Sequence, residues 1–202
     1  TGRIDLSVGA LMIFSVISSV RLMIFLGKHM GLDVMTNGNT YVGPTVSLVC
    51  LTLAIGALVG LLNGLGVAYG RVTSFILTLV SLSALRGLSI GITSGRPYYI
   101  QSEGYQWLGN AQFAGVPIGA IAFMVVFVVF AWLLHGHVLG KRLYAIGGDE
   151  KTARSAGISV EWWVVLVFVA SGVCAACAGV LFTARLTSVD SPLAAGYELS
   201  AI

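Results

Sequence analysis

The sequence predicts an all-α fold, a polytopic membrane helix bundle with at least five transmembrane helices in 202 residues. Hydrophobic residues make up 57% of the chain and charged residues only 9%, whereas soluble domains carry roughly 25% charged residues. The apolar residues gather in runs of the length that a spanning helix needs, about 20 residues. Period-2 alternation is absent, so helices rather than barrel strands must satisfy the backbone in lipid.

The five apolar runs lie at roughly 7–26, 45–68, 74–94, 116–135 and 162–184. The second run carries Gly56, Gly60 and Gly64 four residues apart, a ridge of small residues that predicts close contact with another helix. The fifth contains Cys174 and Cys177. Their spacing is that of redox and zinc motifs, but the other ligands that zinc needs are missing. We therefore expect small packing residues there and no metal site.

The connecting segments set the orientation. If the first residues are cytoplasmic, the inner segments hold six basic residues and the outer ones three; these are Arg3, Arg71, Lys141, Arg142, Lys151 and Arg154 against Lys28, Arg96 and Arg185. Lys and Arg collect in cytoplasmic loops. Segment 136–161 is therefore predicted to face the cytoplasm and segment 95–115 the outside. The aromatic residues of the outer segment, namely Tyr98, Tyr99, Tyr105 and Trp107, are interpreted as an interfacial belt or as a docking surface.

Three polar residues near or within the spans are candidates for a translocation path, because polar groups in a membrane core are costly. Arg86 either contacts the path or bonds backbone carbonyls structurally. Asn63 either lines a path or bonds across a helix interface. Asp5 precedes the first apolar run and either contributes to a path or caps that helix.

Segment 136–161 carries the strongest local pattern. Gly147 and Gly148 are expected to break the chain, and the following DEKTARSAG to form a short helix that ends at Gly157. Glu150 and Arg154 are four residues apart and share one face of that helix. Such a helix either touches a cytosolic partner or is an ordinary interfacial loop.

At GKRLYAIGGDEKTARSAGI the chain resembles the permeases of ABC importers for ribose, xylose and galactose, whose loop reads G-R-x-L-Y-A-I-G-G-N-x-E-A-A-R-x-S-G-I. Further matches are GRIDLSVGA, IGALVGLLNGLGVAYGRVTSFILTL, SALRG and FTARLTSVDSPLAAGYELSAI. The pattern departs at Arg3, where the family usually has glycine, at Lys151 and Thr152, which replace Glu-Ala, and at Ser200, which replaces Asp.

The resemblance implies a single transmembrane permease domain over 1–202, an internal fragment that lacks both termini and includes the coupling loop 136–161. It implies a multi-pass protein of a prokaryotic plasma (inner) membrane that forms the channel of a monosaccharide importer and is not itself an enzyme. ATP and magnesium belong to a separate ATPase subunit or domain, and the other implied partners are an extracytoplasmic sugar-binding protein, a second permease copy (homodimer or heterodimer) and membrane lipid. Matching the motif places the coupling element at Gly147, Gly148, Asp149, Glu150, Ala153 and Gly157. No nucleic acid is expected.

The alternative is an ion-coupled secondary transporter of a small polar solute. Such a carrier needs an ionisable coupling site inside the membrane. In the sequence every Asp and Glu lies near the end of a span or in a loop, which disfavours this alternative. A membrane enzyme is disfavoured because no catalytic set of residues is recognisable.

Overall fold

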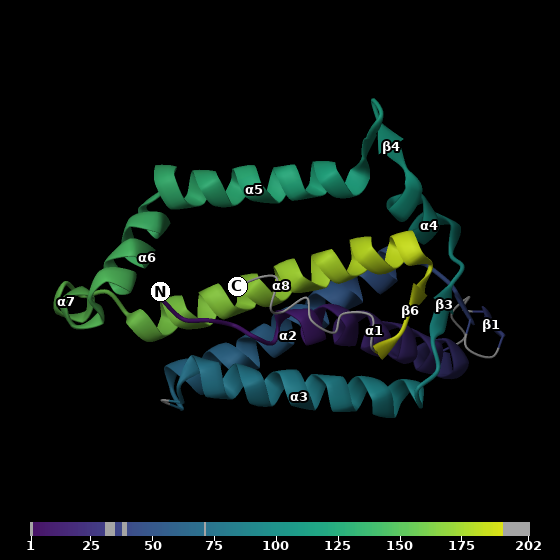
Figure 1. The fold of residues 1–202 in the computed structure, drawn as a ribbon, viewed down its shortest axis with the longest axis horizontal. Coiled ribbons are helices and arrows are strands. Elements are labelled where there is room, and N and C mark those ends of the chain that lie inside the picture. Colours follow the sequence, from purple (N-terminus) through teal and green to yellow (C-terminus); the bar gives the residue numbers. More distant parts are fainter. Residues whose placement is uncertain (1, 31–34, 38–39, 71, 192–202) are drawn as a thin grey trace.

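The computed structural model describes residues 2–30, 35–37, 40–70 and 72–191 (Figure 1). Its five long helices are α1 (Val8–Met30), α2 (Thr45–Ala68), α3 (Ser74–Thr93), α5 (Ile118–Gly136) and α8 (Val160–Leu186). Each is long and apolar enough to cross a membrane. The five predicted spans are confirmed, and their ends differ from the predicted ones by a few residues.

The connections contain more regular structure than the sequence predicted. Segment 95–115 forms strand β3 (Tyr98–Ile100), helix α4 (Glu103–Asn110) and strand β4 (Gln112–Phe113), which pairs with β5 (Val116–Pro117). Strands β1 (Met35–Asn37), β2 (Thr40–Val42), β3 and β6 (Ser188–Val189) form a sheet in the order β1-β2-β3-β6. Strands β2 and β3 are parallel, and the other two pairs are antiparallel. These strands of two or three residues are too short to produce a recognisable alternation.

The sheet end of the bundle has its own core. Tyr41, Ile100, Tyr105 and Val189 are fully buried there, and the Tyr105 hydroxyl lies 2.7 Å from Thr183 Oγ1 on α8. The interpretation of the outer aromatic residues as one surface belt is therefore wrong for Tyr98 and Tyr105, which are buried, while Tyr99 and Trp107 are exposed. The tyrosine ring supplies apolar area to this core, and the hydroxyl of Tyr105 finds its partner within it.

Helices α2 and α8 form the closest contact between spans. A Cβ atom on Gly56 would lie 2.6 Å from Ala176 Cβ, and one on Gly64 would lie 2.9 Å from Val165 Cα. A Cβ on Gly60 would collide with the carbonyl oxygen of Phe168. The predicted ridge of small residues is thus confirmed as a helix-packing surface, because only glycine lets the two backbones approach this closely.

Helix α1 begins inside the bundle. Residues 2–7 are not helical, and Figure 1 shows them starting near the α7 end and running lengthwise to α1. This late start explains Arg21, which lies thirteen residues after Val8, about 20 Å along the helix. It is exposed, and it is carried toward the opposite face of a hydrocarbon core that is about 30 Å thick.

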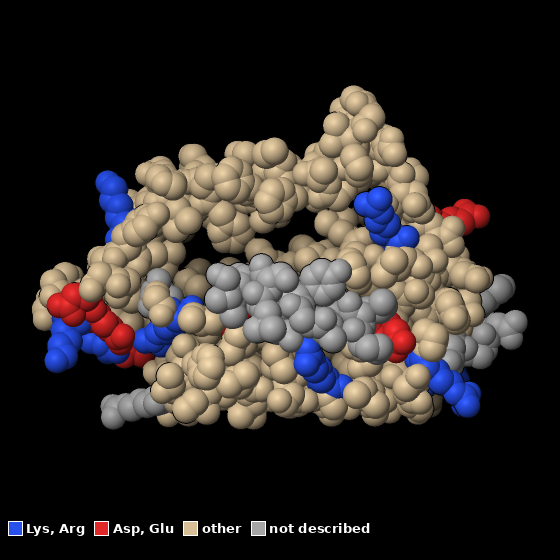
Figure 2. All heavy atoms as spheres, in the orientation of Figure 1, with Lys and Arg blue, Asp and Glu red and all other residues tan. Residues whose placement is uncertain are grey.

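Helix α5 stands apart from the other spans. None of its described residues is buried, and Figure 2 shows open space between it and the rest of the molecule. It is attached through α4 at one end and through α6 (Val138–Gly148) at the other. The facing surfaces of α5, α6 and α8 line an apolar groove of about 460 Å³.

Candidate functional site

The predicted coupling segment folds as two helices, α6 and α7 (Glu150–Ser155), between the spans α5 and α8. Figure 2 shows charged side chains crowded at this end of the molecule. The expectation that Gly147 and Gly148 break the chain is wrong: both belong to the last turn of α6, and the Asp149 N–H still donates to the Ala145 carbonyl at 3.2 Å. The break is at Asp149, whose backbone is extended.

Asp149 caps the N-terminus of α7. Its Oδ1 accepts a 2.9 Å hydrogen bond from the Lys151 N–H, and its Oδ2 accepts one of 2.5 Å from the Thr152 hydroxyl. These donors, that of Thr152 first, lower the pKa of Asp149 below its ordinary value. The cap satisfies a helix N–H that would otherwise lack a partner. It lets a helix of only six residues form here.

Gly157 ends α7 in the predicted way. Its φ is +79°, a left-handed conformation that suits glycine. The Gly157 N–H donates to the Arg154 carbonyl at 3.0 Å, and the Ile158 N–H donates to the Ala153 carbonyl at 3.1 Å. Together these two bonds form a Schellman motif, so both ends of α7 are fixed by specific contacts.

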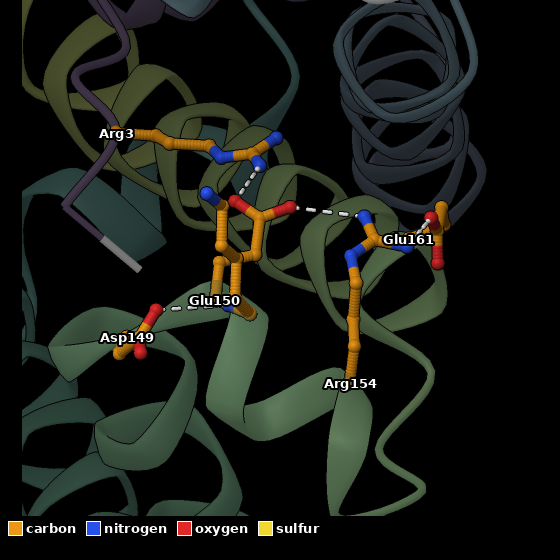
Figure 3. Close-up of polar contacts among 6 residues, drawn as sticks. Arg3, Asp149, Glu150, Arg154 and Glu161 are labelled. Atoms are coloured by element: carbon orange, nitrogen blue, oxygen red, sulfur yellow. Dashed lines mark hydrogen bonds and ion pairs between the residues drawn. The ribbon is translucent and has the colours of Figure 1, made fainter.

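A chain of ion pairs joins α7 to its surroundings (Figure 3). Arg3 Nη2 lies 3.1 Å from Glu150 Oε2, and Arg154 Nη2 lies 2.9 Å from Glu150 Oε1. Arg154 also pairs with Glu161 at the start of α8. The Arg154 hydrogen bond, aided by the charge of Arg3, lowers the pKa of Glu150. The i,i+4 pair on α7 is confirmed, but the sequence did not reveal that Arg3 and Glu161 complete the chain.

The apolar side of α7 is anchored by Ala153, which is 3% exposed. It belongs to a buried cluster with residues of α2, α6 and α8, namely Val67, Ile146, Val160, Trp163, Val164 and Phe168. The opposite side of the helix is open, because Lys151, Thr152 and Ser155 are exposed. α7 is thus held against two spans on one side and faces solvent on the other.

A second group of polar residues crosses the interior of the bundle. Asn63 of α2 donates to Ser7 Oγ at 3.1 Å and accepts from the Ser81 hydroxyl of α3 at 2.5 Å. Asp5 accepts hydrogen bonds from Ser7, both from its N–H at 3.0 Å and from its hydroxyl at 2.6 Å. Ser171 of α8 donates to Asp5 Oδ2 at 3.0 Å. We call these five residues the transmembrane polar network.

The network lies inside the membrane. Asn63 is five residues from the end of α2, Ser81 seven from the start of α3, and Ser171 eleven from the start of α8. At 1.5 Å per residue these positions are about 8–17 Å from those helix ends. Asp5 lies in a non-helical segment next to α1, in agreement with the prediction that every acidic residue is near the end of a span or in a loop. The consequence drawn from that prediction does not hold for Asp5, because segment 2–7 carries it into the bundle, where it contacts Ser171 of α8.

Two of the three candidates for a path, Asp5 and Asn63, are brought together through Ser7. Asn63 does bond across a helix interface. Asp5 binds the N–H of Ser7, the residue just before α1, rather than an N–H within the helix. The bonds of the network do not involve Arg86, which is half-buried on α3 five residues beyond Ser81 and makes contacts of its own. Ser7 and Ser171 were missed because no local pattern distinguishes them from other serines in apolar runs.

The described residues contain no group of three His, Cys, Asp or Glu side chains placed to hold a metal ion. Cys174 and Cys177 are half-buried on α8 and are not paired with each other.

Comparisons with known proteins agree with one another. A family described as "Branched-chain amino acid transport system / permease component" matches residues 1–202. The ribose import permease of Bacillus subtilis (strain 168) is 37% identical over 204 residues, covering 100% of this chain and 58% of the relative. The D-allose transport system permease of Escherichia coli (strain K12) is 31% identical over 199 residues, 98% of this chain and 56% of the relative.

The L-arabinose transport system permease of Escherichia coli (strain K12) is 34% identical over 140 residues, 69% of this chain and 43% of the relative. This chain spans about half the length of these curated relatives. No solved structure matches it.

Proposed function

Because this chain belongs to the family of permease components of branched-chain amino acid type transport systems, we propose that it is part of the membrane channel of an ATP-driven importer for a monosaccharide. The observation that carries this proposal is the 37% identity to a ribose import permease over the whole chain. The relatives named for D-allose and L-arabinose support a sugar as the class of substrate.

The chemistry of the spans suits a neutral, hydroxyl-rich solute. The transmembrane polar network offers hydroxyl, amide and carboxylate groups, which can exchange hydrogen bonds with sugar hydroxyls as the bundle changes shape. We propose Asp5 and Asn63 as groups that line or gate the path. Arg86 is proposed as a third such group from its half-buried place on α3.

We further propose that α7 is the coupling helix, which docks in a groove of a separate ATPase subunit. Its open face presents Lys151 and Ser155, and its buried face rests on α2 and α8 through Ala153. ATP and magnesium would be bound by that subunit, and hydrolysis would switch a permease dimer between inward- and outward-open states. A binding protein would deliver the sugar at the opposite end, near β3 and α4.

A secondary transporter driven by an ion gradient is the second candidate, because Asp5 lies at the depth where such carriers bind their coupling ion. Family membership argues against it, and so do the three hydrogen bonds that Asp5 already accepts from Ser7 and Ser171.

The test uses vesicles that hold the complete permease, its ATPase and its binding protein. Uptake of labelled ribose, D-allose and L-arabinose is measured with and without ATP on the cytoplasmic side, and with and without a protonophore. We expect uptake of at least one sugar that needs ATP and survives the protonophore. Uptake that does not depend on ATP but is abolished by the protonophore would refute this proposal and support the secondary transporter instead.

A further inference from the structure

The segment before α1 is attached at two levels of the molecule. Arg3 is bonded to Glu150 of the coupling helix, and Asp5 is bonded to Ser171 in the interior of α8. Only Ile4 separates these two anchors, so Arg3 and Asp5 are at most about 7 Å apart along the chain. A displacement of Arg3 by more than a few ångströms therefore has to move Asp5.

The inner end of this segment is tightly held. Leu6 is 6% exposed and Ser7 is completely buried, and Ser7 is bonded to Asn63, which is bonded to Ser81. Movement of Asp5 thus reaches α2 and α3 through the transmembrane polar network and reaches α8 through Ser171. Three spans, α2, α3 and α8, therefore share one set of hydrogen bonds with the segment that touches the coupling helix.

We propose that residues 3–7 form a direct link by which movement of the coupling helix changes the transmembrane polar network, with Arg3 as its positioning residue. This inference rests on the proposed role of α7 in coupling. This link is a second connection between α7 and the spans. The first is the buried cluster around Ala153, which packs α7 against α2 and α8.

The size of the effect follows from the exposure of the ion pair. The Arg3 side chain is 22% exposed and that of Glu150 is 42% exposed, and ion pairs this accessible to water are weak. Loss of the pair should therefore reduce transmission a few-fold rather than abolish transport.

The experiment follows two reporters in the complete permease, reconstituted with its ATPase. One version keeps only the native Cys174, which lines the groove beside α8 three residues after Ser171. The other carries only Ser155→Cys, on the open side of α7. The rate of reaction with N-ethylmaleimide is compared between the nucleotide-free state and the state trapped with ATP and vanadate.

We expect both reporters to change rate with nucleotide. Arg3→Gln should reduce the change at Cys174 a few-fold and leave the change at Ser155→Cys intact, while Arg3→Lys, which keeps the charge, should preserve both. Glu161→Gln is the matched control, because it removes the other ion pair of Arg154 and leaves the pair between Arg3 and Glu150 in place. If Arg3→Gln does not accumulate in the membrane, Glu150→Gln breaks the same pair from the side of α7.

Three results separate the possible failures. An unchanged nucleotide response of Cys174 in Arg3→Gln would rule out the link, and so would a Cys174 that never responds while Ser155→Cys does. If the reaction rate of Ser155→Cys does not change with nucleotide while Arg3 and Glu150 are both intact, the proposed coupling role of α7 is refuted.

Discussion

Ser171, near the middle of α8, donates a hydrogen bond of 3.0 Å to the carboxylate of Asp5, 166 positions earlier in the chain. The bond fixes the non-helical start of the chain against the longest helix. It also provides a donor for a carboxylate at a depth where lipid provides none.

The first prediction concerns this bond. Ser171→Ala should destabilise the complete permease by about 1–3 kcal/mol, because the half-buried carboxylate of Asp5 loses a hydrogen-bond donor. Ser18→Ala is the matched control: Ser18 Oγ is the buried side-chain atom without a partner among the described residues, so its removal should be neutral or stabilising. Thermal unfolding in detergent, followed by size-exclusion chromatography, measures both. Equal losses in the two variants would contradict the importance of the bond.

The second prediction concerns the contact between α2 and α8. Gly60→Ala should cost about 1–3 kcal/mol, because the new methyl group would overlap the Phe168 carbonyl and force the helices apart. Gly87→Ala on α3 makes the same chemical change where nothing lies within 4 Å of the new atom, and it should leave the unfolding temperature unchanged or higher. The same thermal assay compares them, and an equally stable Gly60→Ala would show that the contact can adjust.

Gly157 is the subject of the third prediction. Gly157→Val should sharply lower sugar-stimulated ATP hydrolysis, because a β-branched residue at φ +79° is strained by about 1–2 kcal/mol or more. A new Cβ would meet no other atom there, so the effect isolates backbone strain. Gly157→Asn tolerates the left-handed conformation and should retain most activity. Normal stimulation in Gly157→Val would remove α7 from the coupling mechanism.

The fourth prediction is the orientation. Helix α7 and α4 lie at opposite ends of the bundle (Figure 1), and the distribution of basic residues predicts that α7 faces the cytoplasm. In a cysteine-free background, Glu103→Cys should react with an impermeant thiol reagent added outside cells, and Ser155→Cys should react only after the membrane is opened. Both positions are exposed. The reverse labelling pattern would show that α7 faces the outside and α4 the cytoplasm.

The fifth prediction concerns pH. In the folded protein the pKa values of Asp149 and Glu150 are lowered from their ordinary values of 3.8 and 4.5. Above these ordinary values both carboxyl groups are ionised, and each makes its full contribution to the stability of α7. Protection of the Lys151 amide from hydrogen exchange, corrected for the intrinsic rate, should stay constant from neutral pH down to these ordinary pKa values. At lower pH the two carboxylates become protonated, and the protection should fall. Asp149→Asn keeps a capping side chain without the charge and should weaken this dependence. Protection that is lost already near neutral pH would disagree.

The elements that could be predicted from the sequence are those set by local pattern. Long apolar runs give the five spans, the four-residue spacing of Gly56, Gly60 and Gly64 gives a packing face, and the residues from Asp149 to Gly157 contain both caps of a short helix. In each case the residues that determine the structure lie within a few turns of one another.

The depth of Asp5 could not be predicted, because it depends on partners in three other helices. An acidic residue just ahead of an apolar run is read as the boundary of the membrane. Here α1 starts late, since Ser171 and Asn63 provide hydrogen bonds for residues that are not helical. The continuation of α6 through Gly148 was missed for a different reason: glycine lowers helix propensity by only about 1 kcal/mol, which neighbouring contacts override.

The non-helical segment 2–7 also constrains the order in which the protein is assembled. Lipid cannot satisfy the backbone groups of such a segment, so it cannot enter the membrane before its protein partners are present. Those partners include Ser171, which the ribosome adds long after Asp5. Residues 2–7 are made before the five spans, but the bond between Asp5 and Ser171 can form only after α8 has been inserted.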